Sequence, residues 1–200
     1  MKLLSPIPEA AMVAAFLKAE FTSERFGDEL KKVMQKLSVA TEVIVTPDIK
    51  DEHQNELRAK VLGDYRGYKQ NRAIFANFPH NLAWYTAELS REEIGDLRYV
   101  DYSYWNELTN NTHMVKDAVK NIQQDKTVFD VRNDRFLAVA EKIRHGEHDF
   151  EPMILWDKSK DWPLTILEGH LRATAFGLAG KDAPKSILVI VGLADQLPKT

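Results

Sequence analysis

The chain has 200 residues, of which 44% are hydrophobic and 28% are charged. This is the composition of a globular protein, and it excludes a chain that is disordered throughout. The absence of cysteine excludes a disulfide scaffold, a thiolate zinc site, a cysteine nucleophile and thiol redox chemistry. The net charge of -3 excludes a strong overall field for gripping DNA or RNA.

The N-terminal sequence MKLLSPIPEAAMVAAFLKAEF has a basic residue and an apolar start, as a secretory signal does. Pro6, Pro8 and Glu9 interrupt its apolar run. No stretch of the chain approaches the roughly 18 apolar residues that a membrane span needs. We therefore expect a cytoplasmic protein that has no membrane segment.

The first third of the chain is expected to be mostly helical. Residues 8–21 place apolar residues among polar ones and favour a helix, and residues 26–37 repeat apolar residues at steps of three and four, which is typical of an amphipathic helix. The short run 42–46 is rich in β-branched residues and stops at Pro47, so it predicts a strand. Residues 50–64 fit a helix or a strand, and the pattern leaves both open.

The segment 65–105 is rich in aromatic residues and contains all six tyrosines. Arginines and lysines interleave with them, an arrangement that can clamp single-stranded nucleic acid or a nucleotide base. Aromatic side chains more often fill a core or a subunit interface, so core packing or a homodimer contact through this segment is the favoured interpretation. Ser90 and Glu93 have the spacing of a capping box and predict a short helix over 91–97.

The rest of the chain predicts an alternation of helices and strands, and therefore an α+β fold. We expect a small mixed sheet with packed helices over residues 134–200, covered by a mostly helical, aromatic-rich region over residues 1–133. The two parts are expected to form one compact unit. Helices are predicted over 114–122, 134–143 (with Gly146 as its stop) and 171–179, strands over 153–156, 164–167 and 186–192, and a connector over 125–133.

The strongest chemical signal is the segment Glu168-Gly169-His170-Leu171-Arg172, where a strand runs directly into a helix. The backbone N–H groups at a helix N-terminus are unpaired and bind anions, phosphate above all. Arg172 adds a guanidinium that suits phosphate oxygens, and His170 can donate a hydrogen bond or carry a proton. Glu168 can hold magnesium beside the phosphates or act as a base. The alternative is that Gly169 only turns the chain and the polar residues are solvated.

Residues 134–192 resemble the ParB/sulfiredoxin-like superfamily, in particular its stand-alone ParB-like nuclease-type domains. In that pattern a helix precedes a Pro-Ile-x-Val strand, and a later strand ends in a Gly-x-x-Arg corner that an Ala-rich helix and a further strand follow. The family variant Asp/Glu-Gly-His-x-Arg fits residues 168–172. The other matching pieces are residues 139–146, 152–155, 173–179 and 187–191.

The resemblance implies a site for ATP, ADP or CTP at this corner, usually with Mg²⁺. We assign Glu168 and His170 as catalytic candidates and Glu168 as the metal ligand. Gly169, Arg172 and Thr174 are ligand-binding candidates, together with His148 and Glu151 from the loop before the strand at 153–156. The distinct histidine-rich stretch 145–151 fits no strong metal signature and is interpreted as a solvated turn.

Two departures from the family limit what the resemblance implies. Partition proteins carry Gly-Glu-Arg-Arg, whereas His170 and Leu171 stand in the middle here, which weakens the case for CTP-driven switching. Sulfiredoxins use a cysteine, so their reductase chemistry is excluded. The expected function is nucleotide or phosphate-ligand binding, with nucleotide hydrolysis or phosphoryl transfer as the activity. The alternative is a non-enzymatic regulator that contacts DNA or a protein, which a corner closed by a side chain such as Trp156 would favour.

Overall fold

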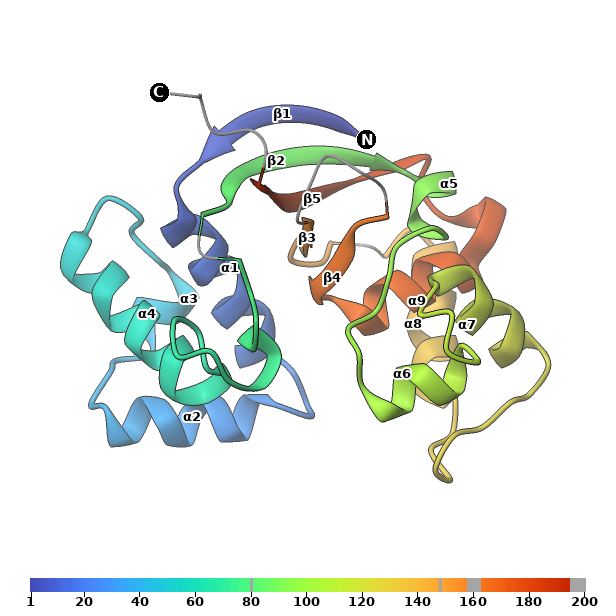
Figure 1. Ribbon diagram of the computed structural model, residues 1–200, viewed down its shortest axis with the longest axis horizontal. Coiled ribbons are helices and arrows are strands. Elements are labelled where there is room, and N and C mark those ends of the chain that lie inside the picture. The colour runs from blue at the N-terminus through green and yellow to red at the C-terminus, as the bar shows by residue number, and fades with distance from the viewer. Residues whose placement is uncertain (80, 148, 158–162, 195–200) are drawn as a thin grey trace. The chain divides into compact units, whose positions relative to one another are not determined.

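The computed structural model describes residues 1–79, 81–147, 149–157 and 163–194. The chain divides into two compact units, which we call the sheet unit (residues 1–5 and 85 onward) and the helical unit (residues 6–84). The described part is an α+β protein, as the sequence predicted, and its one sheet is mixed and has five strands, two of which come from outside residues 134–200 (Figure 1). Residues 85–133, which the sequence grouped with the N-terminal region, lie in the sheet unit.

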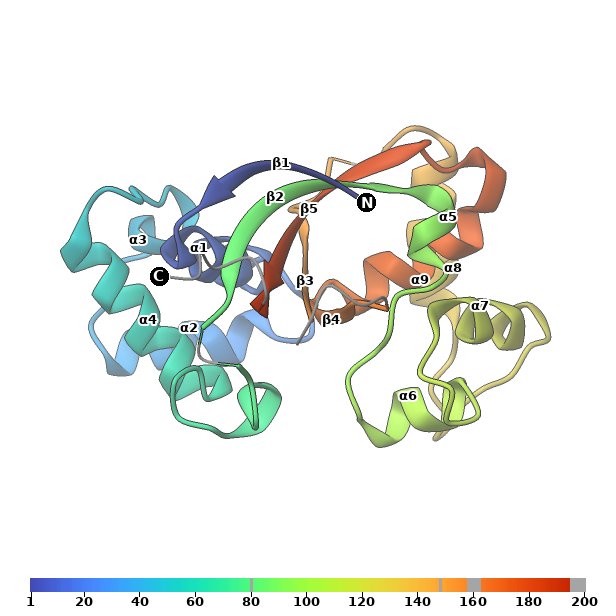
Figure 2. The same cartoon turned by 45° about the horizontal axis from the view of Figure 1, so that its top comes forward.

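The sheet has the strand order β1-β2-β5-β3-β4. β3 pairs antiparallel with β4 and parallel with β5, so the three strands predicted in the C-terminal third lie together in one sheet. Strands β1 and β2 run in opposite directions along the other side of the sheet (Figures 1 and 2). The bounds are Lys2–Ile7 for β1, Ala83–Ser90 for β2, Met153–Asp157 for β3, Thr165–Glu168 for β4 and Ser186–Leu193 for β5.

Helices α8 and α9 lie side by side against the sheet (Figure 2). Alternate residues of the strands, such as Leu89, Leu155 and Val191, join Ala140 and Phe176 of these helices in one buried core. Ser90 and Glu93 form the predicted capping box, but the helix that they begin is shorter than expected. The helices of this unit are α5 (Arg91–Ile94), α6 (Ser103–Leu108), α7 (Val115–Gln123), α8 (Asp134–Arg144), α9 (His170–Ala179) and the 3₁₀ turn η2 (Gly180–Asp182).

The helical unit packs its apolar stripes around a core that includes Phe16, Leu30 and Leu62. A buried polar group accompanies this core, because the Glu20 carboxylate accepts hydrogen bonds from the Tyr65 hydroxyl and the Arg66 guanidinium. The described part of the chain contains no helix with the length and apolar character needed to cross a bilayer. The helices of this unit are α1 (Glu9–Phe21), α2 (Gly27–Lys36), α3 (Glu42–Val45), α4 (Glu52–Arg66) and the 3₁₀ turn η1 (Ala73–Phe75).

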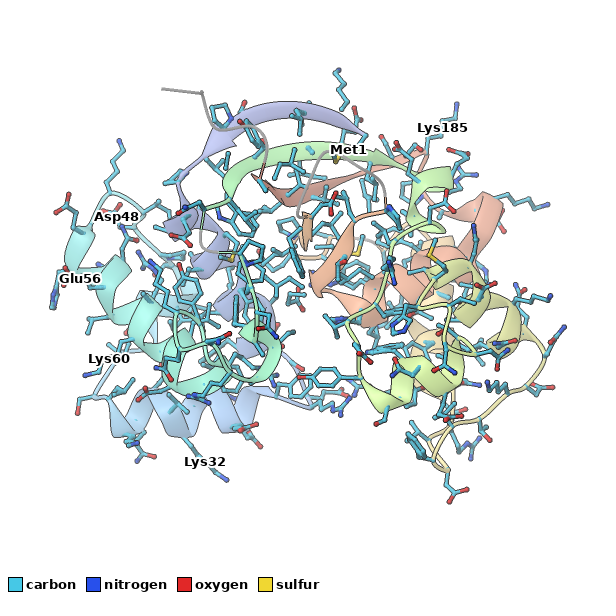
Figure 3. All side chains as sticks on the ribbon, viewed as in Figure 1. Met1, Lys32, Asp48, Glu56, Lys60 and Lys185 are labelled. Atoms are coloured by element: carbon cyan, nitrogen blue, oxygen red, sulfur yellow. The ribbon has the colours of Figure 1, made fainter. Side chains whose placement is uncertain are left out.

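The strand predicted over residues 42–46 is wrong, because this run forms the helical turn α3. Ile44 is fully buried, and a short apolar run of this kind fits a buried helix as well as a strand. The loop after α3, which contains Asp48 (Figure 3), is tied to α4 by Arg58. The Arg58 guanidinium donates to the carbonyl oxygens of Val43 and Asp48 at 2.8 and 2.7 Å. Tertiary contacts therefore override the β-branched composition here.

Candidate functional site

The corner between β4 and α9 depends on the backbone of Gly169. This residue has φ 103° and ψ 21°, in the left-handed region that only glycine adopts without strain. A Cβ atom at this position would also lie 2.7 Å from Cγ of Met153 on the neighbouring strand. Both the positive φ and the close approach of Met153 require glycine at this position. Gly169 is thus the residue that lets β4 turn directly into α9.

The N-terminus of α9 is capped by Gly169, which has no side chain to accept a hydrogen bond from the first turn. The first backbone hydrogen bond of the helix runs from the Ala173 N–H to the Gly169 carbonyl at 2.9 Å. The N–H groups before it have no partner within the helix, as in every α-helix. With the positive end of the helix dipole, they give this corner the donors that an anion uses.

Arg172 lies across the corner and is already engaged by protein groups. Its guanidinium donates one hydrogen bond to the Glu168 carboxylate and another to the Glu151 carbonyl oxygen. The side chains of Arg172 and Glu168 are only 12% and 14% exposed. The corner is therefore closed by an ion pair between the last residue of β4 and the first turn of α9.

His170 leaves the first turn of α9 on a different side from Arg172. Its ring stacks on Trp105 with centroids 5.5 Å apart and on Tyr99 with centroids 6.0 Å apart, nearly parallel in both cases. Trp105 and Tyr99 themselves stack at 4.1 Å. Two residues along an α-helix correspond to a rotation of about 200°, which explains why the two side chains diverge.

Thr174 points into the core and is fully buried. Its hydroxyl donates to the His170 carbonyl at 2.8 Å and lies 2.8 Å from the Tyr99 hydroxyl. Burial raises the pKa of Tyr99, and the hydrogen bond with Thr174 opposes that rise. The Thr174 side chain thus holds α9 to the segment that carries Tyr99, and its hydroxyl is used within the protein.

A cleft of about 210 Å³ opens beside Arg172 at the N-terminal ends of the parallel strands β3 and β5. Its lining is mostly apolar and includes Phe150 and Phe176, which meet edge to face with centroids 6.5 Å apart. Arg172, Glu151 and Ser186 supply its polar groups. A cleft of this kind can hold a small organic body while Arg172 contacts a polar end.

The structure thus brings together four of the candidate residues: Glu168, Gly169, Arg172 and Glu151, the last through its backbone carbonyl. It directs His170 to the aromatic stack and Thr174 to the core. The candidate His148 lies outside the described residues.

The charges at the corner do not sum to a positive site. In the part of the chain that the structure describes, the single positive charge of Arg172 is matched at the corner by the Glu168 carboxylate. Among the described residues, no group of three or more His, Asp or Glu side chains is arranged to hold a metal ion. Magnesium usually combines one or two protein carboxylates with phosphate oxygens, so Glu168 fits this ion only as part of a complex with a phosphate ligand.

Sequence reasoning missed the apolar half of the cleft and the partners of His170. Leu188, near the start of β5, is 53% exposed and lines the cleft, although it stands in a continuous apolar run. Such a run has no alternation that would reveal which residue faces outward. Tyr99 and Trp105 belong to the aromatic segment that the sequence assigned to a core or an interface. Their stack on His170 joins residues about 70 positions apart, which periodicity does not reveal.

Comparisons of the chain with protein-family models, with curated proteins and with solved structures give no match. The class that the fold itself defines is an α+β protein whose mixed sheet ends in a strand–glycine–helix corner. The only support for a family is the sequence motif at residues 168–172 and the order of the described helices and strands around it.

Proposed function

We propose that the chain is a ParB-like protein that binds a nucleotide or another phosphate-containing ligand at the β4–α9 corner. The observation that carries the proposal is the position of Arg172 at the N-terminus of α9, which has no side-chain cap, at the edge of a cleft. Helix N–H groups and a guanidinium are the two donor types that proteins combine to bind phosphate. The order β3, β4, Gly169, α9, β5 also agrees with the order in the superfamily.

In this proposal the phosphate accepts hydrogen bonds from the first turn of α9 and from Arg172, while the organic part of ATP or CTP lies in the cleft. Glu168 is the residue that would hold Mg²⁺ at the phosphate, and the ion would neutralise phosphate charge there. Because the Glu168 carboxylate already pairs with Arg172, we expect a nucleotide to bind more tightly with Mg²⁺ than without it.

The test is calorimetric titration of the purified chain with ATP, CTP, ADP and pyrophosphate, each with and without Mg²⁺. We expect Arg172→Ala to reduce affinity about 10- to 100-fold, because a charge-assisted bidentate contact is worth about 1.5–3 kcal/mol. Arg144→Ala is a matched control, since Arg144 also contacts a carboxylate (Glu141) and a backbone carbonyl (Leu178). A parent that binds none of these ligands, or an Arg172→Ala variant that binds as the parent does, would overturn the proposal.

Turnover is a separate measurement at the same corner. If the bound nucleotide is hydrolysed, a proton must leave the attacking water, and Glu168 is the carboxylate placed to accept it. We then expect Glu168→Gln to abolish phosphate release while nucleotide binding survives. Phosphate release from all four nucleoside triphosphates with Mg²⁺, by the parent and by this variant, decides the point.

The second candidate function is a non-enzymatic regulator that keeps this fold and contacts DNA or a protein. The observation that favours it is the Glu168–Arg172 ion pair, which closes the corner with the chain's own side chains. This candidate predicts a parent without nucleotide binding and without turnover, so the same titrations separate the two functions.

A further inference from the structure

The Glu168 carboxylate occupies the place on the Arg172 guanidinium where the anionic group of a ligand would bind. The two residues are four apart in sequence, but Gly169 separates them, so Glu168 belongs to the strand and Arg172 to the helix. The pair therefore spans the corner and is largely shielded from solvent. An exposed pair on one helix face would exchange freely with water, whereas this one occupies the inside of the candidate site.

A carboxylate and a phosphate present similar oxygens to a guanidinium. Both accept two parallel hydrogen bonds from the same N–H fork, and both carry negative charge. A phosphate that reaches this fork at Arg172 must therefore displace the Glu168 carboxylate or lie beside it against a like charge. Either outcome lowers the affinity of the corner for an anion.

We infer that Glu168 is an internal competitor that keeps the anion site closed, and that ligands bind by replacing its carboxylate on Arg172. This inference rests on the proposed function. Arg172 keeps a second anchor during the exchange, because the Glu151 carbonyl accepts its other hydrogen bond. The guanidinium can thus remain over the corner while the Glu168 side chain moves away.

The apparent affinity of a closed site is its intrinsic affinity multiplied by the open fraction. If the corner is open about one tenth of the time, removal of the competitor raises anion affinity about tenfold. The effect has the opposite sign to the loss expected when a ligand-binding side chain is removed. A variant of Glu168 therefore distinguishes a competitor from a residue that only helps to hold the anion.

The experiment is calorimetric titration with pyrophosphate in the presence of EDTA, so that no divalent cation contributes. We expect Glu168→Gln to bind pyrophosphate about tenfold more tightly than the parent. Glu141→Gln is the matched control, since it also removes a carboxylate that pairs with an arginine, Arg144, but lies outside the lining of the cleft. We expect that control to change the affinity less than threefold, because the Glu141 side chain is exposed and its charge is screened by solvent and salt.

Three outcomes would overturn the inference. Equal or weaker pyrophosphate binding by Glu168→Gln would show that Glu168 does not compete, although binding by the parent would still support the proposed function. Equal gains from Glu168→Gln and Glu141→Gln would show a general effect of charge. Absence of pyrophosphate binding in EDTA by the parent and by both variants would overturn the inference, and the proposed function falls with it only if the parent also fails to bind ATP, CTP, ADP and pyrophosphate with Mg²⁺.

A second variant keeps the test informative if Glu168→Gln fails to fold. Glu168→Asp keeps the charge but draws the carboxylate back by one methylene, so it loosens the ion pair without a change in net charge. We expect its affinity for pyrophosphate to lie between those of the parent and Glu168→Gln. Adding Arg172→Gln to either variant should remove the gain, and a gain that persists would place the anion elsewhere.

Discussion

The hydroxyl of Tyr99 lies 2.8 Å from the hydroxyl of Thr174 and joins the segment after α5 to the second turn of α9. Thr174 donates its own proton to the His170 carbonyl, so Tyr99 is the donor in the bond between the two hydroxyls. Both side chains are buried. This pair fixes the end of α9 that carries Arg172. The Thr174 hydroxyl has its hydrogen-bond partners within the protein, so its buried position is explained without a bound ligand.

We predict unequal costs for removing the two hydroxyls. In Tyr99→Phe, Thr174 keeps its bond to the His170 carbonyl, so the free energy of unfolding should fall by only about 0.5–1.5 kcal/mol. In Thr174→Val, the buried Tyr99 hydroxyl loses its acceptor, and the cost should be about 1–3 kcal/mol. Urea unfolding of both variants gives the comparison, and a larger loss in Tyr99→Phe would contradict it.

Gly169→Ala should destabilise the chain by about 2–4 kcal/mol, because backbone strain at a positive φ adds to a clash with Met153. Gly146→Ala provides the control, since Gly146 also has a positive φ of 81° but a Cβ atom added there would meet no other atom within 4 Å. That variant should lose only about 1–2 kcal/mol from the strain. The double variant Gly169→Ala with Met153→Ala should remove the clash and leave the strain, which a double-mutant cycle in urea measures.

The sequence predicted the elements around the corner because their signals are local. Gly146 ends α8, Ser90 and Glu93 form their capping box, and the strands β3, β4 and β5 are short apolar runs between turn residues. Each of these depends on neighbours within a few positions. The same is true of Gly169, whose place between a strand and a helix is visible in the sequence.

The parts that were missed depend on distant contacts. Strand β1 is exposed along most of its length and has no alternating pattern, and its place in the sheet comes from pairing with β2, some 80 residues away. The ion pair between Arg172 and Glu168 depends on the detailed geometry of the turn at Gly169, which the sequence does not specify. The separation of His170 from Arg172 depends on where α9 begins, and helix boundaries are uncertain by one or two residues.

We predict that the free energy of unfolding of the helical unit depends strongly on Arg58. Its side chain is fully buried and donates to the carbonyl oxygens of Val43 and Asp48, so its loss removes the hydrogen bonds that tie the loop after α3 to α4. We expect Arg58→Met to lower the free energy of unfolding by about 2–4 kcal/mol. Lys60→Met, at an exposed position on the same helix (Figure 3), should change it by less than about 0.5 kcal/mol.

Chemical denaturation of both variants, followed by circular dichroism, measures these differences. Arg58→Lys adds a second comparison, because a single ammonium does not reproduce the planar fork that reaches both carbonyls. We expect it to recover less than half of the loss. Equal stability of the parent and Arg58→Met would show that the loop after α3 does not need this anchor.

The last prediction separates the ring of His170 from the anion site. The ring stacks on Trp105 and Tyr99, while Arg172 lies across the corner on another side of the helix. His170→Ala should therefore lower the free energy of unfolding by about 1–3 kcal/mol, as the loss of a packed aromatic contact does. The backbone N–H of residue 170 remains, so affinity for pyrophosphate should stay within about twofold of the parent.

His170→Phe keeps a flat ring in the stack and removes both ring nitrogens. We expect its stability to lie within about 1 kcal/mol of the parent, since the aromatic contact is retained. Its pyrophosphate affinity should also match the parent, in contrast to Arg172→Ala. If His170→Phe instead loses affinity as strongly as Arg172→Ala does, a ring nitrogen contacts the anion, and the His170 side chain must leave the stack when the ligand binds.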